Sequence, residues 1–205
     1  MNGVSDRSNG YAPGRARRER ILDAAILAFG QSGFHTATLA DIARACGISR
    51  PGLLHHFDSK EALLTAVLER RDRIDSDTFM TATARSITPL QAIVDIMSEN
   101  AKTPGLTELY AVLSAEATNP QHPAHDYFAS LYGRLRVDLG EALEEMRASG
   151  ALAADTPVTD LANELIALKD GLTLQALLRP GTIDPAAALA RAIRRLTGVD
   201  VTAGR

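Results

Sequence analysis

Three neighbouring side chains have the chemistry needed to bind DNA. Arg50 lies in the first turn of a short predicted helix, where a guanidinium can contact both major-groove acceptors of a guanine base. His55 belongs to the polar side of the same helix, whose apolar side contains Leu53 and Phe57. Lys60 begins the next predicted helix, where backbone N–H groups and the ammonium together form a site for phosphate. The pattern indicates one base-reading position followed by one phosphate-binding position.

A helix-turn-helix motif over residues 38–57 is predicted to position these side chains. Thr38 and Asp41 form a capping-box pattern at the start of the first short helix. Gly47 can end that helix with a positive φ, and Ser49 can cap the second one. In such a motif the second helix enters the major groove, and its N-terminal residues contact the bases.

The run from Arg17 to Leu68 closely resembles the DNA-binding domain of TetR-family transcriptional regulators. The matching segments are ILDAAILAFG, GFHTAT, IARACGIS, LLHHF and SKEALL. The resemblance implies a phosphate contact at Lys60. It also shows a departure, because Leu54 replaces a tyrosine that usually contacts phosphate, and His55 is the nearest substitute. The candidate DNA-binding residues are Thr38, Arg44, Ser49, Arg50, Pro51, Gly52, His55 and Lys60.

Charge is distributed unevenly along the chain of 205 residues, whose net charge is −3. Residues 1–73 contain eleven Lys and Arg against eight Asp and Glu, a net charge of +3, so the remainder carries −6. A basic head on an acidic body attracts DNA at one end of the molecule. Arg15, Arg17, Arg18 and Arg20 open the first helix and either contact phosphate or simply face solvent.

The spacing of apolar residues predicts an all-α protein. The first helix is expected to end at Gly30 and Gly33, with Phe34 beginning the loop to the helix-turn-helix. A long helix over about 60–84 leaves the head and enters the body, and residues 85–198 form five further helices. The predicted segments are a disordered tail over 1–13, a DNA-binding domain over 14–74, a ligand-binding and dimerisation domain over 75–198, and a tail over 199–205.

The last two predicted helices are apolar on more than one side, which favours a dimer interface. A helix of this kind must be buried on several sides, and Ala167 and Gly171 are small enough to let two helices approach closely. We expect two helices from each subunit to form a four-helix bundle, as the resemblance also implies, unless they are simply the core of a monomer. The assigned interface residues are Leu161, Leu165, Ala167, Leu168, Gly171, Leu172, Gln175, Ile193 and Leu196.

The middle helices are expected to surround a ligand pocket. Polar groups in apolar settings are its candidate lining, with Met97 as a soft wall, although each could instead be an ordinary structural residue. These candidates are Met97, Tyr110, Glu116, Tyr127, Asn163 and Asp170. Such a pocket favours a medium-sized, largely hydrophobic effector. His122 and His125 lack the further ligands of a metal site, so neither a metal nor a cofactor is expected.

These features predict a ligand-responsive DNA-binding regulator, acting as a homodimeric repressor that a small molecule releases from a palindromic operator. The alternative is a constitutive DNA-binding protein or an activator without an effector. An enzyme is not expected, because the sequence has no Gly-rich phosphate loop and no recognisable nucleophile–base arrangement. A cytoplasmic location is expected, with no membrane partner, because no stretch approaches the roughly 18 apolar residues of a membrane span, no signal peptide is evident, and the single Cys46 fits a reducing compartment.

Overall fold

The computed structural model describes residues 11–84, 88–102 and 104–201, and within these ranges every regular element is a helix. The all-α prediction is therefore confirmed. The helices are α1 (Tyr11–Thr36), α2 (Leu39–Ala45), α3 (Arg50–Leu54), α4 (Lys60–Ala84), α5 (Pro89–Asn100), α6 (Pro104–Glu116), α7 (His125–Ala148), α8 (Val158–Leu178) and α9 (Pro185–Thr197). Among the described residues, no helix combines the length and the apolar character needed to cross a membrane.

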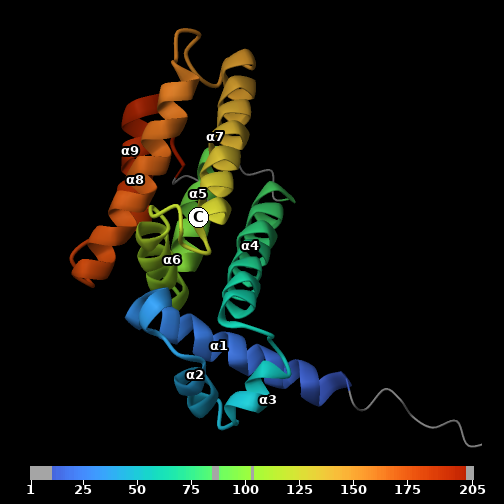
Figure 1. Cartoon of the computed structure of the whole chain (residues 1–205). Helices are drawn as coiled ribbons and strands as arrows, with labels where there is room; N and C mark the ends of the chain where they lie inside the picture. The colour runs from blue at the N-terminus through green and yellow to red at the C-terminus, as the bar shows by residue number, and fades with distance from the viewer. Residues whose placement is uncertain (1–10, 85–87, 103, 202–205) are drawn as a thin grey trace, which may run out of the picture.

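The helices form a small head and a longer body (Figure 1). α1 lies across the base of the body, with α2 and α3 on its far side (Figure 1). α4 rises from the head and packs against α5. In the body, α8 packs against both α7 and α9, and α9 also packs against α5.

One hydrophobic cluster joins the head to the body. It contains Ile21, Leu22 and Phe29 of α1 together with Leu109 and Leu113 of α6, all of them fully buried, and it continues into α2, α3 and α4. A second cluster is built mainly from α5, α7, α8 and α9. The predicted boundary between the two domains falls inside α4. Head and body therefore share a core and are not joined by a free linker.

The first helix ends differently from the expectation. α1 continues through Gly30 and reaches Thr36, with a kink at Gly33, whose φ is 73°. A Cβ atom added at Gly30 would lie only 3.2 Å from the backbone nitrogen of Leu109 in α6. Gly30 therefore does not terminate the helix. It allows α1 and α6 to approach closely, and only Gly33 provides the change of direction.

The predicted caps of the helix-turn-helix are confirmed. Thr38 Oγ1 accepts a hydrogen bond from the Asp41 backbone N–H, and Ser49 Oγ accepts one from the Gly52 N–H, each at 3.1 Å. Gly47 follows α2 with a φ of 66°. The two caps fix the starts of α2 and α3, because they satisfy N–H groups that the first turn of a helix leaves without a partner.

The structure changes the predicted bounds of both tails. Residues 1–10 lie outside the described residues, and Tyr11 already belongs to α1. At the other end, Val201 is 4 % exposed and belongs to the second cluster, with Val199 packed against it. Residues 199–201 are therefore part of the body and do not form a tail.

The close approach of α1 and α6 predicts that a larger residue at Gly30 will destabilise the protein. Gly30→Val should lower the free energy of unfolding by about 1–3 kcal/mol, because the side chain would overpack against the backbone of α6. Gly133→Val is the matched control, since Gly133 is exposed in α7 and a Cβ there would meet nothing within 4 Å. Urea unfolding of both variants decides the point. Equal losses of stability at the two positions would contradict the close approach.

Candidate DNA-binding head and effector pocket

The first turn of α3 is exposed and basic. Leu53 is fully buried in the head, which holds the helix in place and leaves Arg50, Pro51 and His55 at the surface. Among the described residues, the Arg50 side chain has no ion-pair or hydrogen-bond partner. Gly52 is half-buried beside the Ser49 cap. This geometry leaves the Arg50 guanidinium available for an external acceptor.

Two candidate residues, the N-cap of α2 and Arg44 within it, converge on the Asp41 carboxylate. Thr38 Oγ1 donates a hydrogen bond of 2.6 Å to Asp41 Oδ2, and an Arg44 nitrogen lies 2.9 Å from Asp41 Oδ1. The Thr38 hydroxyl, followed by Arg44, holds the pKa of Asp41 below its ordinary value. All three side chains are exposed, and an ion pair in water is weak. Arg44 can therefore leave Asp41 for a phosphate, whereas Thr38 has a structural role as the cap.

Lys60 lies back against the last turn of α1. Its ammonium donates a hydrogen bond of 3.1 Å to the carbonyl oxygen of His35 and lies 4.5 Å from the centre of the Phe34 ring. An ammonium has three N–H donors, so this contact still leaves donors for a phosphate oxygen. The hydrogen bond to His35 fixes the position of the ammonium beside the start of α4.

Basic side chains of α1 lie next to the end of α3. The Arg18 guanidinium is 4.8 Å from the centre of the Phe57 ring. Burial lowers the pKa of His56, and the nearby charges of His55, Arg17 and Arg18 lower it further. Leu54, which stands where the resemblance leads us to expect a tyrosine, is half-buried, whereas His55 is exposed.

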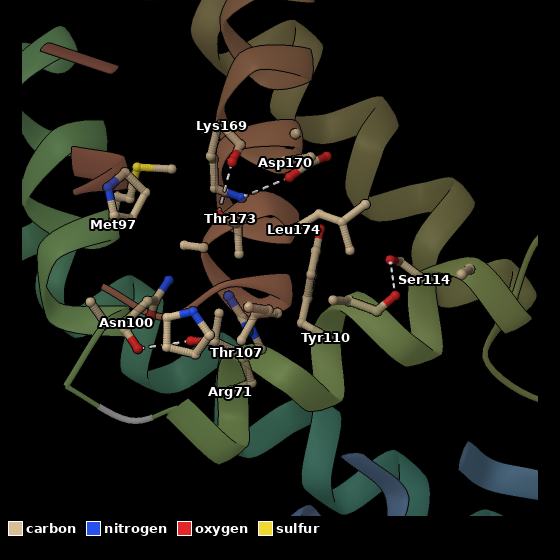
Figure 2. A pocket seen from close by; sticks show the side chains of 18 of the residues that line it. Arg71, Met97, Asn100, Thr107, Tyr110, Ser114, Lys169, Asp170, Thr173 and Leu174 are labelled. Atoms are coloured by element: carbon tan, nitrogen blue, oxygen red, sulfur yellow. Dashed lines mark hydrogen bonds and ion pairs between the residues drawn. The ribbon is translucent and has the colours of Figure 1, made fainter. Parts of the chain in front are cut away.

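The body contains a cavity of about 660 Å³ between α5, α6 and α8 (Figure 2). Met97, Tyr110 and Asp170, three of the predicted ligand-binding residues, line it. A second cavity of about 590 Å³ lies beside it and is lined by residues of α4, α5, α7 and α8. Arg71 and Lys169 line both cavities, together with Tyr110.

Arg71 and Lys169 line the cavities although the sequence did not indicate them as ligand-binding residues. Arg71 is 4 % exposed, donates a hydrogen bond of 3.3 Å to the Leu106 carbonyl, and has its guanidinium carbon 4.2 Å from the centre of the Tyr110 ring. The Lys169 ammonium lies 5.3 Å from the same ring centre. The only signal in the sequence was that Lys169 adjoins Asp170 in a largely apolar helix.

The other three predicted pocket residues do not line either cavity. Glu116 accepts a hydrogen bond of 2.8 Å from the Phe34 N–H and so ties α6 to the head. Tyr127 donates a hydrogen bond to Asp72, and burial, followed by that carboxylate, raises the pKa of the Tyr127 phenol. Asn163 is exposed and accepts a hydrogen bond of 3.1 Å from Arg136 Nε. Each of these three polar side chains therefore has a structural partner within the protein.

The predicted dimer-interface residues fall into two groups. Leu161, Leu165 and Ile193 are buried in the second cluster of the same subunit, so they cannot contact a partner. The remaining residues are exposed or half-buried, namely Ala167, Leu168, Gly171, Leu172, Gln175 and Leu196. Leu174 and Leu178, which were not predicted, are 51 % and 72 % exposed. Residues 167, 171, 174 and 178 repeat at helical spacing, so α8 presents one apolar stripe at its surface.

His122 and His125 shape the loop between α6 and α7. His122 Nδ1 accepts a hydrogen bond of 3.1 Å from the Ala124 N–H, and His125 Nδ1 lies 2.8 Å from the Ala117 carbonyl oxygen. His122 Nε2 lies 3.5 Å from a carboxylate oxygen of Glu116, and burial holds the pKa of His122 below its ordinary value. No group of three or more potential metal ligands occurs in the part of the chain that the structure describes.

Comparison with known protein families gives two matches. The family described as bacterial regulatory proteins of the tetR family matches residues 21–67, which run from within α1 to the first third of α4. The family described as the C-terminal part of BetI-type transcriptional repressors matches residues 87–199, which is more than half of the chain.

Individual relatives agree with these families. The HTH-type transcriptional regulator UidR of Escherichia coli K12 is 30 % identical over 175 residues, covering 72 % of this chain and 85 % of that protein. A transcriptional regulator from Saccharomonospora viridis, solved in complex with choline, has a TM-score of 0.75 at 22 % identity over 89 % of this chain and 98 % of its own. A TetR-family regulator from Agrobacterium tumefaciens has a TM-score of 0.74 at 20 % identity over 90 % and 99 % of the two chains.

The contact between Glu116 and the head predicts a stabilising role for this carboxylate. Glu116→Ala should lower the free energy of unfolding by about 1–3 kcal/mol, because the partly buried Phe34 N–H loses its acceptor. Glu116→Gln keeps an acceptor oxygen and should lose less. Glu108→Ala, at an exposed position of the same helix, is the control and should change stability little. Urea unfolding measures all three, and similar losses for the Glu116→Ala and Glu108→Ala variants would contradict this role.

Proposed function

The chain belongs to the TetR family of bacterial transcriptional regulators, and on that premise we propose that it is a ligand-responsive repressor that binds a palindromic operator as a homodimer. Members of this family regulate transcription and are not enzymes. In this proposal α3 reads the operator, the apolar stripe of α8 joins two subunits, and the cavity between α5, α6 and α8 receives the effector. The protein acts in the cytoplasm, where the chromosome lies.

The observation that carries the proposal is the position of Arg71. It lies on α4, the helix that starts in the head at Lys60, and it lines the cavity in the body. At a rise of about 1.5 Å per residue, roughly 16 Å of continuous helix separates Lys60 from Arg71. A ligand that contacts Arg71 therefore touches the same rigid element that begins beside the DNA-binding surface.

The mechanism we propose is a shift between two conformations of the dimer. Operator DNA selects the conformation in which the two α3 helices lie about 34–36 Å apart, one turn of the double helix. The effector binds a conformation with a different separation more tightly. Switching between these states requires a difference in binding free energy of several kcal/mol, so the effector must contact elements that move between the two conformations.

Subunit association is supported by the surface of α8. Leu174 and Leu178 are large apolar side chains at the surface, and Ala167 and Gly171 precede them on the same stripe. Gly171 and Leu174 also belong to the lining of the cavity, so the stripe borders it. Small residues allow two helices to approach closely, and the leucines would bury apolar area against a partner. The same stripe on a second subunit would form a twofold interface, in which each residue has its counterpart on the partner.

The proposed DNA contacts are tested by two substitutions that should behave differently. Arg50→Ala should weaken binding to the selected operator by about 1–3 kcal/mol and relax the preference at one base position in each half-site, because a guanidinium reads the base. Lys60→Ala should weaken binding to operator and random DNA alike and flatten the salt dependence by about one unit per subunit, because an ammonium contacts phosphate.

Fluorescence anisotropy with operator and random duplexes, over a range of salt concentrations, measures both effects. Glu108→Ala, which changes an exposed charge of the body, serves as the control. If Arg50→Ala weakens binding to both duplexes equally, base reading by Arg50 is wrong. An unchanged salt dependence for Lys60→Ala removes Lys60 from the phosphate contacts. If the wild-type protein selects no sequence at all, the proposed function itself fails.

The proposed dimer predicts the effect of a charged residue in the stripe of α8. Ala167→Arg should separate the subunits and abolish tight operator binding, because a long cationic side chain cannot be buried where two helices approach closely. Ala129→Arg, at an exposed position of α7, is the control and should leave the dimer intact. Sedimentation at micromolar concentration reports the mass of each variant. A wild type that sediments as a monomer would contradict the interface.

A further inference from the structure

His122 is a titratable side chain buried at the junction between the head and the body. The side chain is 0 % exposed, although it belongs to the short loop between α6 and α7. The rings of Phe34 and His35, in the last turn of α1, lie edge-on to the His122 ring, with centre-to-centre distances of 5.3 and 5.4 Å. His122 therefore packs the loop before α7 directly against the end of α1, where the chain turns towards α2.

The hydrogen bond at Nδ1 fixes where the His122 ring carries its proton. Nδ1 accepts a hydrogen bond of 3.1 Å from the N–H of Ala124, the residue that precedes α7. Because an acceptor nitrogen carries no hydrogen, the single proton of the neutral ring lies on Nε2. The imidazolium needs a second proton on Nδ1, and that proton would face the Ala124 N–H. Protonation of His122 in place therefore breaks the bond that holds the start of α7.

The Nε2 atom of His122 faces a carboxylate that already has a partner. It lies 3.5 Å from Glu116 Oε2 and, among the described residues, has no hydrogen-bond partner. The same Oε2 accepts the hydrogen bond of 2.8 Å from the Phe34 N–H, and the carboxylate fills the space that a side chain at Gly33 would need. A charged ring at position 122 would therefore attract the carboxylate that ties α6 to α1.

Titratable and charged groups from α1, α4, α6 and α7 surround His122. Glu116 belongs to α6 and His35 to α1, while Lys60 of α4 reaches the junction through its bond to the His35 carbonyl. His125 begins α7. Burial lowers the pKa of His122 and outweighs the Glu116 carboxylate, which raises it, and the nearby His35 lowers the pKa further. The junction therefore favours the neutral ring.

From this geometry we propose that His122 is a proton-sensitive positioning residue, which holds the loop before α7 against the head only while its ring is neutral. Above about pH 6.5, the ordinary histidine value, the ring is neutral in the folded and the unfolded chain, and the junction has its full stability. As the pH falls below that value, the unfolded chain binds a proton that the folded junction resists. The folded protein therefore loses stability until the pH reaches the lower pKa of the folded state.

His125 provides a control of the same chemical type three residues further along the chain. Its Nδ1 lies 2.8 Å from the Ala117 carbonyl oxygen, which can only accept, so Nδ1 carries the ring proton. A second proton can be added at Nε2 without breaking this bond. The two histidines of one loop thus differ in the role of Nδ1, and only His122 must lose a hydrogen bond in order to become charged.

Two asparagine substitutions in the full-length protein test the proposal by urea unfolding at a series of pH values. His122→Asn keeps an acceptor oxygen for the N–H two residues on, as asparagine does in turns, but cannot take up a proton. From about pH 7.5 to about pH 5.5, the unfolding equilibrium constant of the wild type should rise roughly three- to tenfold more than that of His122→Asn. His125→Asn should follow the wild-type profile.

The comparison uses the change with pH, because the smaller side chain also removes packing and shifts the whole stability profile of His122→Asn. Parallel profiles for the wild type and His122→Asn contradict the proposal. The same flattening of the profile in both asparagine variants contradicts it as well, since His122 would then have no special role.

Nuclear magnetic resonance of the wild type gives a second measurement, which does not depend on the folding of a variant at His122. Substituting the other four of the five histidines in turn assigns their ring signals and leaves that of His122. At about pH 6, where an ordinary histidine is largely charged, the His122 ring should be neutral with its proton on Nε2. A titration midpoint at or above the ordinary value, or a neutral ring with its proton on Nδ1, overturns the proposal.

Operator binding shows whether the junction also places the head, and this measurement rests on the proposed function. Acid should weaken operator binding more in the wild type than in His122→Asn, because both proteins have the same histidines on the DNA-binding surface. An equal change in the two proteins refutes a role of His122 in positioning the head. A protein that selects no operator loses the proposed function, whereas the unfolding profiles and the ring titration still decide the response of His122 to acid.

Discussion

The close packing of α1 against α6 is the constraint on which the rest of the structure depends. Gly30 faces the backbone of Leu109, and a Cβ at Gly105 of α6 would lie 3.1 Å from a methyl carbon of Leu27. The kink at Gly33 follows directly and brings the Phe34 N–H to Glu116. Because a close-packed interior transmits a displacement and does not absorb it, the head moves with α6 and does not swing on a linker.

α4 is the second connection between head and body. Like α1, it makes contacts with α6. At its start, Lys60 donates to the carbonyl of His35, in the segment that also bonds Glu116. Three turns later, Arg71 donates to the Leu106 carbonyl of α6 and stacks on Tyr110. A change in the position of Arg71 therefore affects α4 and α6 together. On the proposed function, this convergence would allow a ligand in the body to alter the placement of α3 without touching it.

The sequence predicted what depends on local chemistry and missed what depends on distant partners. The caps at Thr38 and Ser49 involve neighbours three residues away, so their patterns were sufficient. A glycine that ends a helix and one that permits a close crossing look alike in sequence, so Gly30 was misassigned. Leu161, Leu165 and Ile193 were placed in the dimer interface because an apolar helix does not indicate which side meets its own core. Arg71 and Lys169 were missed because basic residues on helices usually face solvent.

The lining of the larger cavity includes a residue of the helix that begins in the head. A ligand shifts a conformational equilibrium only through the difference in its binding free energy between the two states. The apolar lining belongs to helices of the body, and Arg71 is the only residue of α4 among the described residues that line the cavity of about 660 Å³. On the proposed function, a ligand that contacts Arg71 reaches the helix that begins in the head, so this contact would contribute to the difference.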